Sequence, residues 1–185
     1  MGKIIGIDLG TTYSAIAQLD DLGTPEVLAS IDNNKKITAS SVYIKDQNIT
    51  VGDKALDALN TEPNNVVTET KRQMENDVVF SADQGKWVDR DESNKNFYTP
   101  AQISSFILSK LKTYSADVKR AVITVPALFA EKARVATLDA AKMAGIEVIS
   151  LINEPTAAAC YYASLPNVKK ITGNILVFDL GGGTF

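Results

Sequence analysis

The sequence predicts an α/β protein with a mixed five-stranded sheet, flanking helices and an inserted, smaller α/β subdomain. Three short apolar runs separated by turns open the chain, a pattern typical of an antiparallel β-meander. These runs lie at 3–8, 14–19 and 26–30. From residue 99 onward helical and strand patterns alternate, and right-handed crossovers of this kind place parallel strands in one sheet. We therefore expect the core of the fold at 1–36 and 112–170, and the inserted subdomain at 37–111.

The remaining elements follow from local signals. Further strands are expected at 41–44, 48–51, 121–125, 147–151 and 175–179, and helices at 53–59, 99–111, 131–144 and 154–163. Thr99, Pro100 and Gln102 have the spacing of a capping box at a helix start. The acidic, turn-rich stretch 77–96 indicates a peripheral hairpin in which Trp87 packs rather than binds a ligand.

Two expectations concern side chains on the predicted helices. Val135, Leu138 and Ala141 fall on one face of the helix at 131–144, and this face is expected to be buried. Cys160 lies in an alanine-rich run, which favours a buried structural thiol over a reactive one.

Composition excludes several classes of chemistry. The chain has no histidine, so it has no Ser-His-Asp triad, Cys-His pair or HExxH zinc site. Its single cysteine excludes an intrachain disulfide and a CxxC redox pair. The formal net charge of −3 argues against non-specific nucleic-acid binding, and no apolar run approaches the ~20 residues of a membrane span. Without a secretion signal, the expected location is the cytoplasm.

The most informative motif occurs twice. Ile7–Thr12 reads IDLGTT and Phe178–Thr184 reads FDLGGGT, each within or after an apolar run. Glycines let the backbone approach phosphate oxygens, and exposed amides in such a turn bind anions. The aspartate before each turn is placed to hold a hydrated Mg²⁺ beside the phosphates. Two ordinary β-turns are the alternative, but the repetition after two apolar runs favours a phosphate site.

Four blocks of sequence also resemble one known family. GIDLGTTYS, VPALF, INEPTAAA and FDLGGGTF resemble the nucleotide-binding domain of the heat-shock 70-kilodalton chaperones, which belong to the actin, sugar-kinase and heat-shock ATPase superfamily. These blocks lie at 6–14, 125–129, 152–159 and 178–185. The resemblance implies a ribonuclease-H-like, actin-type ATPase lobe over most of the chain. It also implies that 171–185 form the opening strand and phosphate loop of a second lobe that continues beyond this sequence.

The resemblance assigns roles to matching positions. The implied phosphate-binding residues are Gly10, Thr11, Thr12 and Tyr13 in the first loop and Gly181, Gly182, Gly183 and Thr184 in the second. The implied catalytic residues are Lys71, Glu154 and Asp179. Asp8 and Asp179 are the implied carboxylates for Mg²⁺, held through water. Pro126 and Arg134 are the implied residues of interdomain coupling.

Each of the less specific assignments has a simpler alternative. Lys71 could be a surface lysine in a charged turn, and Glu154 could provide only a favourable charge at a helix N-terminus. Pro126 could merely end a strand, and Arg134 could be a solvated helix charge.

The family resemblance implies ATP and ADP as ligands, with Mg²⁺, and water as the nucleophile in phosphoryl transfer. The intact protein is then expected to be an ATP-hydrolysing chaperone of the stress response. Its expected partners are unfolded peptides, a J-domain co-chaperone and a nucleotide-exchange factor. The 185-residue chain alone is expected to bind ATP weakly and to turn it over little. The alternatives are a sugar- or acetate-kinase-type enzyme of the same superfamily and a non-catalytic module that binds co-chaperones.

Overall fold

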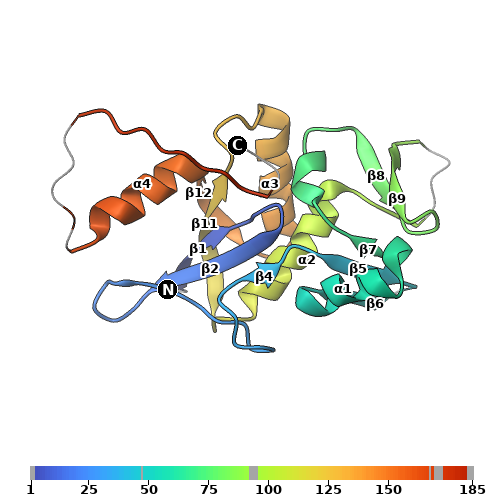
Figure 1. Ribbon diagram of the computed structural model, residues 1–185, viewed down its shortest axis with the longest axis horizontal. Helices are drawn as coiled ribbons and strands as arrows, with labels where there is room; N and C mark the ends of the chain where they lie inside the picture. The colour runs from blue at the N-terminus through green and yellow to red at the C-terminus, as the bar shows by residue number, and fades with distance from the viewer. Residues whose placement is uncertain (1–2, 47, 92–95, 167, 169–172, 183–185) are drawn as a thin grey trace.

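The computed structural model describes residues 3–46, 48–91, 96–166, 168 and 173–182, and a mixed sheet lies at its centre (Figure 1). Within these residues the strand order is β12-β11-β1-β2-β3, and β4 pairs with β2. The strands are β1 (Lys3–Asp8), β2 (Tyr13–Leu19), β3 (Pro25–Val27), β4 (Thr38–Ala39), β11 (Val118–Val125) and β12 (Glu147–Asn153). β1 is parallel to β11 and β11 to β12, whereas β1–β2 and β2–β3 are antiparallel. The predicted mixed sheet is confirmed.

The direction of each strand follows from what connects it to the next. Short turns join β1, β2 and β3, so these strands alternate in direction. A helix precedes each of β11 and β12 and carries the chain back to the end of the sheet where β1 begins. β11 and β12 therefore run parallel to β1. The helices are α2 (Pro100–Lys112), α3 (Glu131–Met143) and α4 (Glu154–Ser164). One buried cluster joins the sheet to α2 and α3, and its largest members include Ile5, Ile7, Ile16, Ile103, Ile107, Leu108, Leu111 and Ile123.

Helix α2 begins with the capping box that the sequence predicts. The Thr99 hydroxyl accepts a hydrogen bond from the Gln102 amide (3.2 Å), and the Gln102 side chain accepts one from the Thr99 amide (2.8 Å). Pro100 occupies the first helical position, where a missing N–H costs nothing. Two backbone donors at the start of α2 are thereby satisfied.

Replacing Thr99 with alanine is expected to lower the free energy of unfolding by about 1 kcal/mol, the usual cost of losing an N-cap. The substitution leaves the Gln102 amide without its acceptor. Urea denaturation of the two proteins followed by circular dichroism measures the difference. Equal stability of the two proteins would contradict this account of the helix start.

Two smaller sheets and a short helix lie between β4 and α2. The first sheet has the order β6-β5-β7 and the second β10-β8-β9. Their strands are β5 (Val42–Lys45), β6 (Asn48–Val51), β7 (Val66–Val67), β8 (Val78–Ser81), β9 (Lys86–Asp89) and β10 (Phe97–Tyr98), with α1 (Asp53–Asp57) after β6. Phe80 and Trp87 pack edge to face across β8 and β9, with ring centroids 5.7 Å apart. The predicted hairpin and the packing role of Trp87 are confirmed, and the division into a core and a subdomain stays a prediction.

The predicted buried face of α3 is wrong at two of its three positions, because Ala141 is buried but Val135 and Leu138 are not. Val135 and Leu138 are 45% and 41% exposed, whereas the smaller side chains of Ala133, Thr137 and Ala140 are almost fully buried. α3 lies directly against α2, and small residues let two helices approach closely. Close packing therefore selected the small-residue face of α3 over the larger apolar one.

Two expectations about the C-terminal part are also wrong. Cys160 is exposed, because α4 buries no residue against the described part of the chain. No strand forms at 175–179: residues 174–181 have no regular secondary structure and no β-pairing. A strand is stable only when a neighbour satisfies its backbone groups, and no described strand lies beside this segment in the sheet order.

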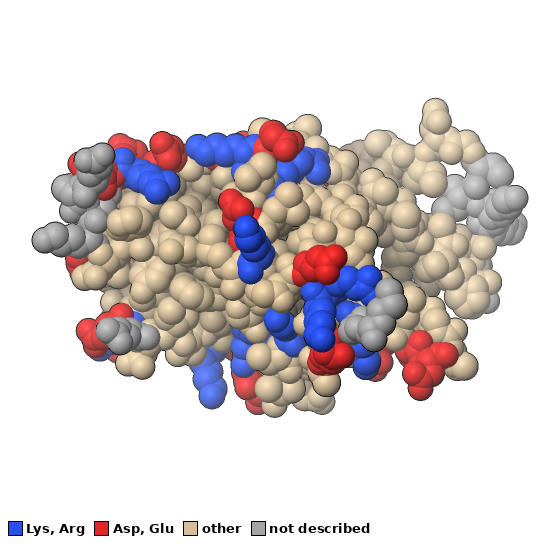
Figure 2. Space-filling view, turned by 180° about the vertical axis from the view of Figure 1, so that it is seen from behind, with Lys and Arg blue, Asp and Glu red and all other residues tan. Residues whose placement is uncertain are grey.

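The surface shows mixed charge on its back face. Figure 2 shows lysine and arginine side chains interspersed with aspartate and glutamate rather than gathered in one basic area. No helix in the described residues is both long enough and apolar enough to cross a membrane.

Candidate functional site

A cavity of about 730 Å³ opens at the carboxyl ends of the parallel strands. Open α/β sheets commonly bind ligands at this edge, and the volume suits a small-molecule ligand. The predicted site residues that line it are Asp8, Gly10, Thr11, Thr12, Tyr13, Lys71, Glu154, Asp179, Gly181 and Gly182. Pro126 and Arg134 do not line it, and Gly183 and Thr184 lie outside the described residues. The structure thus brings together residues from four separate stretches of sequence.

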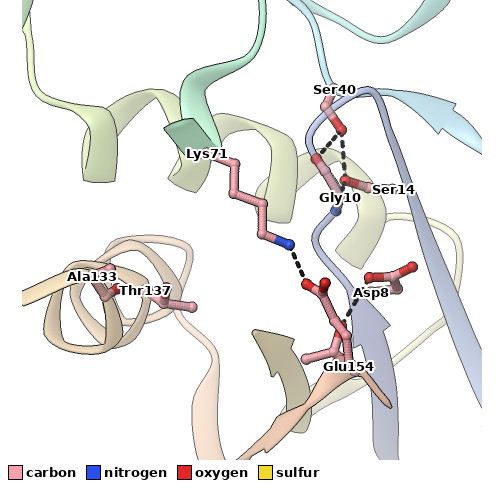
Figure 3. A network of polar contacts seen from close by, with 9 residues as sticks. Asp8, Gly10, Ser14, Ser40, Lys71, Ala133, Thr137 and Glu154 are labelled. Carbon is pink, nitrogen blue, oxygen red and sulfur yellow. Dashed lines mark hydrogen bonds and ion pairs between the residues drawn. The ribbon is translucent and has the colours of Figure 1, made fainter. Parts of the chain in front are cut away.

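The first glycine turn is held by a ring of hydrogen bonds (Figure 3). The Gly10 amide donates to the Ser14 hydroxyl (3.2 Å), and the Ser40 hydroxyl donates to the Gly10 carbonyl (2.8 Å). The two hydroxyls are 2.8 Å apart. A Cβ atom on Gly10 would lie 2.0 Å from the carbonyl oxygen of Tyr13, so only glycine fits here.

The two glycine turns lie side by side. A Cβ atom on Gly182 would lie 2.1 Å from the Thr12 hydroxyl oxygen, which shows how closely the turns approach. The Arg72 guanidinium donates to the Gly182 carbonyl (3.3 Å) and pairs with Glu69 (2.7 Å). The two turns that the sequence repeats therefore face a common space.

Lys71 and Glu154 form an ion pair inside the cavity, and Figure 3 shows their side chains pointing toward one another. The lysine sits in the short 3₁₀ turn Thr70–Gln73, and Glu154 is the first residue of α4. Only 6% of the Lys71 side chain and 16% of the Glu154 side chain are exposed. The ammonium group also lies 5.9 Å from the centroid of the Phe129 ring. The alternative of a surface lysine is therefore wrong.

Burial raises the pKa of Glu154 above its ordinary value of 4.5. The negative charges of Asp8 and Asp179 raise this pKa further, and the Lys71 ammonium opposes the shift. Asp8 and Asp179 thus lie close enough to Glu154 to influence it, although both are exposed and only the Lys71–Glu154 pair is largely shielded from solvent. A perturbed carboxylate such as Glu154, in contact with a buried lysine, is typical of functional sites.

The raised pKa of Glu154 is expected to make stability depend on pH. Between pH 4.5 and the higher pKa, the folded chain binds more protons at this site than the unfolded chain. This contribution to the free energy of unfolding therefore falls as pH rises through that window. We expect the stability of the wild type relative to Glu154→Gln to decrease from pH 4.5 upward, measured by urea denaturation. A constant or increasing difference would contradict the assigned shift.

Asp8 is positioned by the neighbouring parallel strand. Asp8 and Thr124 are paired in register between β1 and β11, and the Thr124 hydroxyl donates to the Asp8 carboxylate (2.8 Å). No group of three acidic, histidine or cysteine side chains within the described residues is close enough to hold a metal directly. Carboxylates that line a cavity without enclosing an ion fit Mg²⁺, which keeps several waters and takes other ligands from phosphate.

Arg134 and Pro126 lie outside the lining of the cavity. Arg134 donates from Nε to the Phe129 carbonyl (3.1 Å) and from Nη2 to the Asn153 side chain (2.8 Å). Arg134 is therefore not a solvated helix charge. Pro126 directly follows β11, as expected of a residue that ends a strand. Arg134 thus contacts Phe129, whose ring lies beside Lys71, and Asn153, which directly precedes Glu154.

Sequence reasoning missed several residues that shape the site: Ser14, Ser40, Arg72, Thr124 and Phe129. Ser14 and Phe129 lie inside recognised blocks, so their positions could have drawn attention. Thr124 could have been found from its place near the end of a parallel strand. Ser40 and Arg72 carry no local signal.

Comparisons with known proteins agree with this geometry. The model of the family described as Hsp70 protein matches residues 4–185. The chain is 45% identical over 187 residues to the chaperone protein DnaK of Mycoplasmopsis agalactiae, covering 98% of the chain and 29% of that relative. The chain therefore spans less than a third of the length of this curated relative. On the family match and this identity, the chain belongs to the Hsp70 family.

Proposed function

We propose that this chain supplies the phosphate-binding half of an ATP-hydrolysing site in a molecular chaperone. One observation carries the proposal. Two glycine turns, three carboxylates and a buried lysine from distant parts of the sequence line a single cavity. A kinase of the same superfamily is not favoured, because the family match is to Hsp70 and the relative is a chaperone.

The two turns are proposed to hold the phosphates. Thr11, Thr12 and Tyr13 offer amides and hydroxyls in the first turn, and Gly181 and Gly182 offer backbone in the second. Gly183 and Thr184 are proposed to extend the second turn, as the family resemblance implies. Charged phosphates favour such amide-rich concavities.

Lys71, Glu154 and Asp179 are proposed to act on the attacking water. The ammonium group of Lys71, whose side chain is only 6% exposed, stabilises charge that develops on the transferred phosphate. The carboxylate of Glu154 is placed to accept a hydrogen bond from the nucleophilic water. When bound, Mg²⁺ would neutralise phosphate charge, and Asp8 and Asp179 would hold it through water.

The activity of the whole protein is proposed from the family. ATP turnover would drive binding and release of unfolded peptides, with a J-domain co-chaperone and a nucleotide-exchange factor as partners, in the cytoplasm and under stress. Pro126 and Arg134 are proposed to couple the nucleotide site to that binding. The contacts of Arg134 with Phe129 and Asn153 support this role, because both residues adjoin the Lys71–Glu154 pair.

The test is a titration of the isotope-labelled chain with ATP and Mg²⁺, followed by amide chemical shifts. Shifts are expected at Gly10–Tyr13, Gly181 and Gly182. AMP is the matched control, because it lacks the two outer phosphates and is expected to shift these amides much less. Equal effects of ATP and AMP, or shifts confined to other regions, would overturn the proposed phosphate site.

A further inference from the structure

Two buried serines join the first glycine turn to a segment far away in the sequence. Ser14 lies on β2 and is 1% exposed, and Ser40 directly follows β4 and is 3% exposed. β4 and β2 pair with one another, which brings the two hydroxyls to 2.8 Å. Buried hydroxyl groups are costly unless they are hydrogen-bonded, and here each serves the other.

The direction of these hydrogen bonds can be assigned. A hydroxyl has one proton to donate, and that of Ser40 goes to the Gly10 carbonyl. The Ser14 hydroxyl must therefore donate to Ser40 while it accepts from the Gly10 amide. The result is a closed ring in which both polar backbone groups of Gly10 are satisfied within the protein.

Ser40 also controls a second carbonyl of the turn. Its backbone amide donates to the Thr12 carbonyl (2.8 Å), so Ser40 holds the carbonyl oxygens of both Gly10 and Thr12. A carbonyl oxygen turned toward a phosphate would repel it, whereas an amide would attract it. By holding both carbonyls, Ser40 leaves the phosphate to meet the amides that follow Gly10.

We infer that Ser40, acting with Ser14, is a positioning residue that sets the shape of the first phosphate-binding turn. The inference rests on the proposed function, because it assigns a means of ordering the turn that binds phosphate. It also specifies which groups bind. The Gly10 amide belongs to the ring, and the amides of Thr11 to Tyr13 face the ligand.

The test uses inorganic tripolyphosphate with Mg²⁺ as the probe, which needs only the phosphate turns. Ser40→Ala removes the donor to the Gly10 carbonyl and is expected to weaken binding about tenfold, as for a lost buried hydrogen bond. Ser41→Ala is the matched control. Ser41 is equally buried, and its hydroxyl takes no part in the ring of hydrogen bonds at Gly10. The affinity of the Ser41→Ala variant for tripolyphosphate is expected to stay within about twofold of that of the wild type.

Two further measurements separate positioning from general stability. The Ser14→Ala and Ser40→Ala effects on affinity should not add in the double variant, because both break one ring. Hydrogen exchange of the Gly10 amide should speed up in Ser14→Ala without any ligand present, while exchange in the hairpin of β8 and β9, which lies away from β2 (Figure 1), stays unchanged.

The outcomes distinguish a failure of the positioning role of Ser40 from a failure of the proposed phosphate site. If wild-type shifts appear at Thr11–Tyr13 but Ser40→Ala binds as tightly as Ser41→Ala, the positioning role is overturned and the phosphate site stands. If the wild type shows no shifts at this turn, the proposed function fails. Faster Gly10 exchange in Ser14→Ala would still support the ring in that case, and unchanged exchange would overturn it.

Discussion

Replacing Lys71 with alanine is expected to reduce ATP turnover about 10²–10³-fold in the protein at its full natural length. Lys71 lines the cavity, forms an ion pair with Glu154, and has an almost fully buried side chain. In such a poorly solvated space, a fixed positive charge stabilises developing phosphate charge far more than it would in water. Nucleotide affinity is expected to change much less, because the glycine turns remain intact. Steady-state hydrolysis and calorimetric binding of ATP measure the two quantities separately.

The matched control for Lys71→Ala is Lys35→Ala. Lys35 also forms an ion pair, with Asp53 at 2.8 Å, but its side chain is 61% exposed and does not line the cavity. Exposed pairs of this kind contribute little, so Lys35→Ala is expected to keep wild-type turnover. Unchanged hydrolysis in Lys71→Ala, or an equal loss in both variants, would contradict the role proposed for Lys71.

Replacing Gly10 with alanine is expected to weaken binding of ATP with Mg²⁺ about 10²-fold. The added Cβ atom would lie 2.0 Å from the Tyr13 carbonyl oxygen, a backbone atom that cannot rotate aside. The turn must therefore shift by an ångström or so, and displacements of that size around a reacting group cost about this factor. Calorimetry with ATP gives the affinity, and thermal unfolding shows whether the chain remains folded.

Gly6→Ala provides the control for this substitution. Gly6 lies on β1, lines the same cavity, and has open space where a Cβ atom would be added. The affinity of the Gly6→Ala variant for ATP is expected to match that of the wild type. Similar losses at Gly6 and Gly10 would show that the loss does not depend on the tight turn at Gly10.

The two glycine turns of the candidate site were predictable because each is marked by a few adjacent residues. An aspartate and a glycine turn after an apolar run are visible in a few adjacent residues, and this signal occurs twice. The structure places both turns on one cavity. The capping box of α2 was predictable for the same reason, since all its partners lie within four residues.

Features that depend on packing between distant elements were not predictable. The face of α3 was assigned from the size of Val135 and Leu138, but contact with α2 favours the smaller side chains. Thr124 and Ser40 act through strand register, with β1 beside β11 and β2 beside β4. No local pattern in the sequence states which strand lies beside which, so partners of this kind appear only in the folded chain.

The Lys71–Glu154 ion pair sets a threshold for what can occupy the cavity. The lysine already has a satisfied, desolvated partner, so an incoming ligand competes with Glu154 for the ammonium group. A neutral or singly charged molecule offers little in exchange for that carboxylate. A polyanion that brings its own cation can take the ammonium group while leaving the charge of Glu154 compensated. The pair is therefore expected to select ligands by charge, and to favour a triphosphate with its cation over singly charged anions.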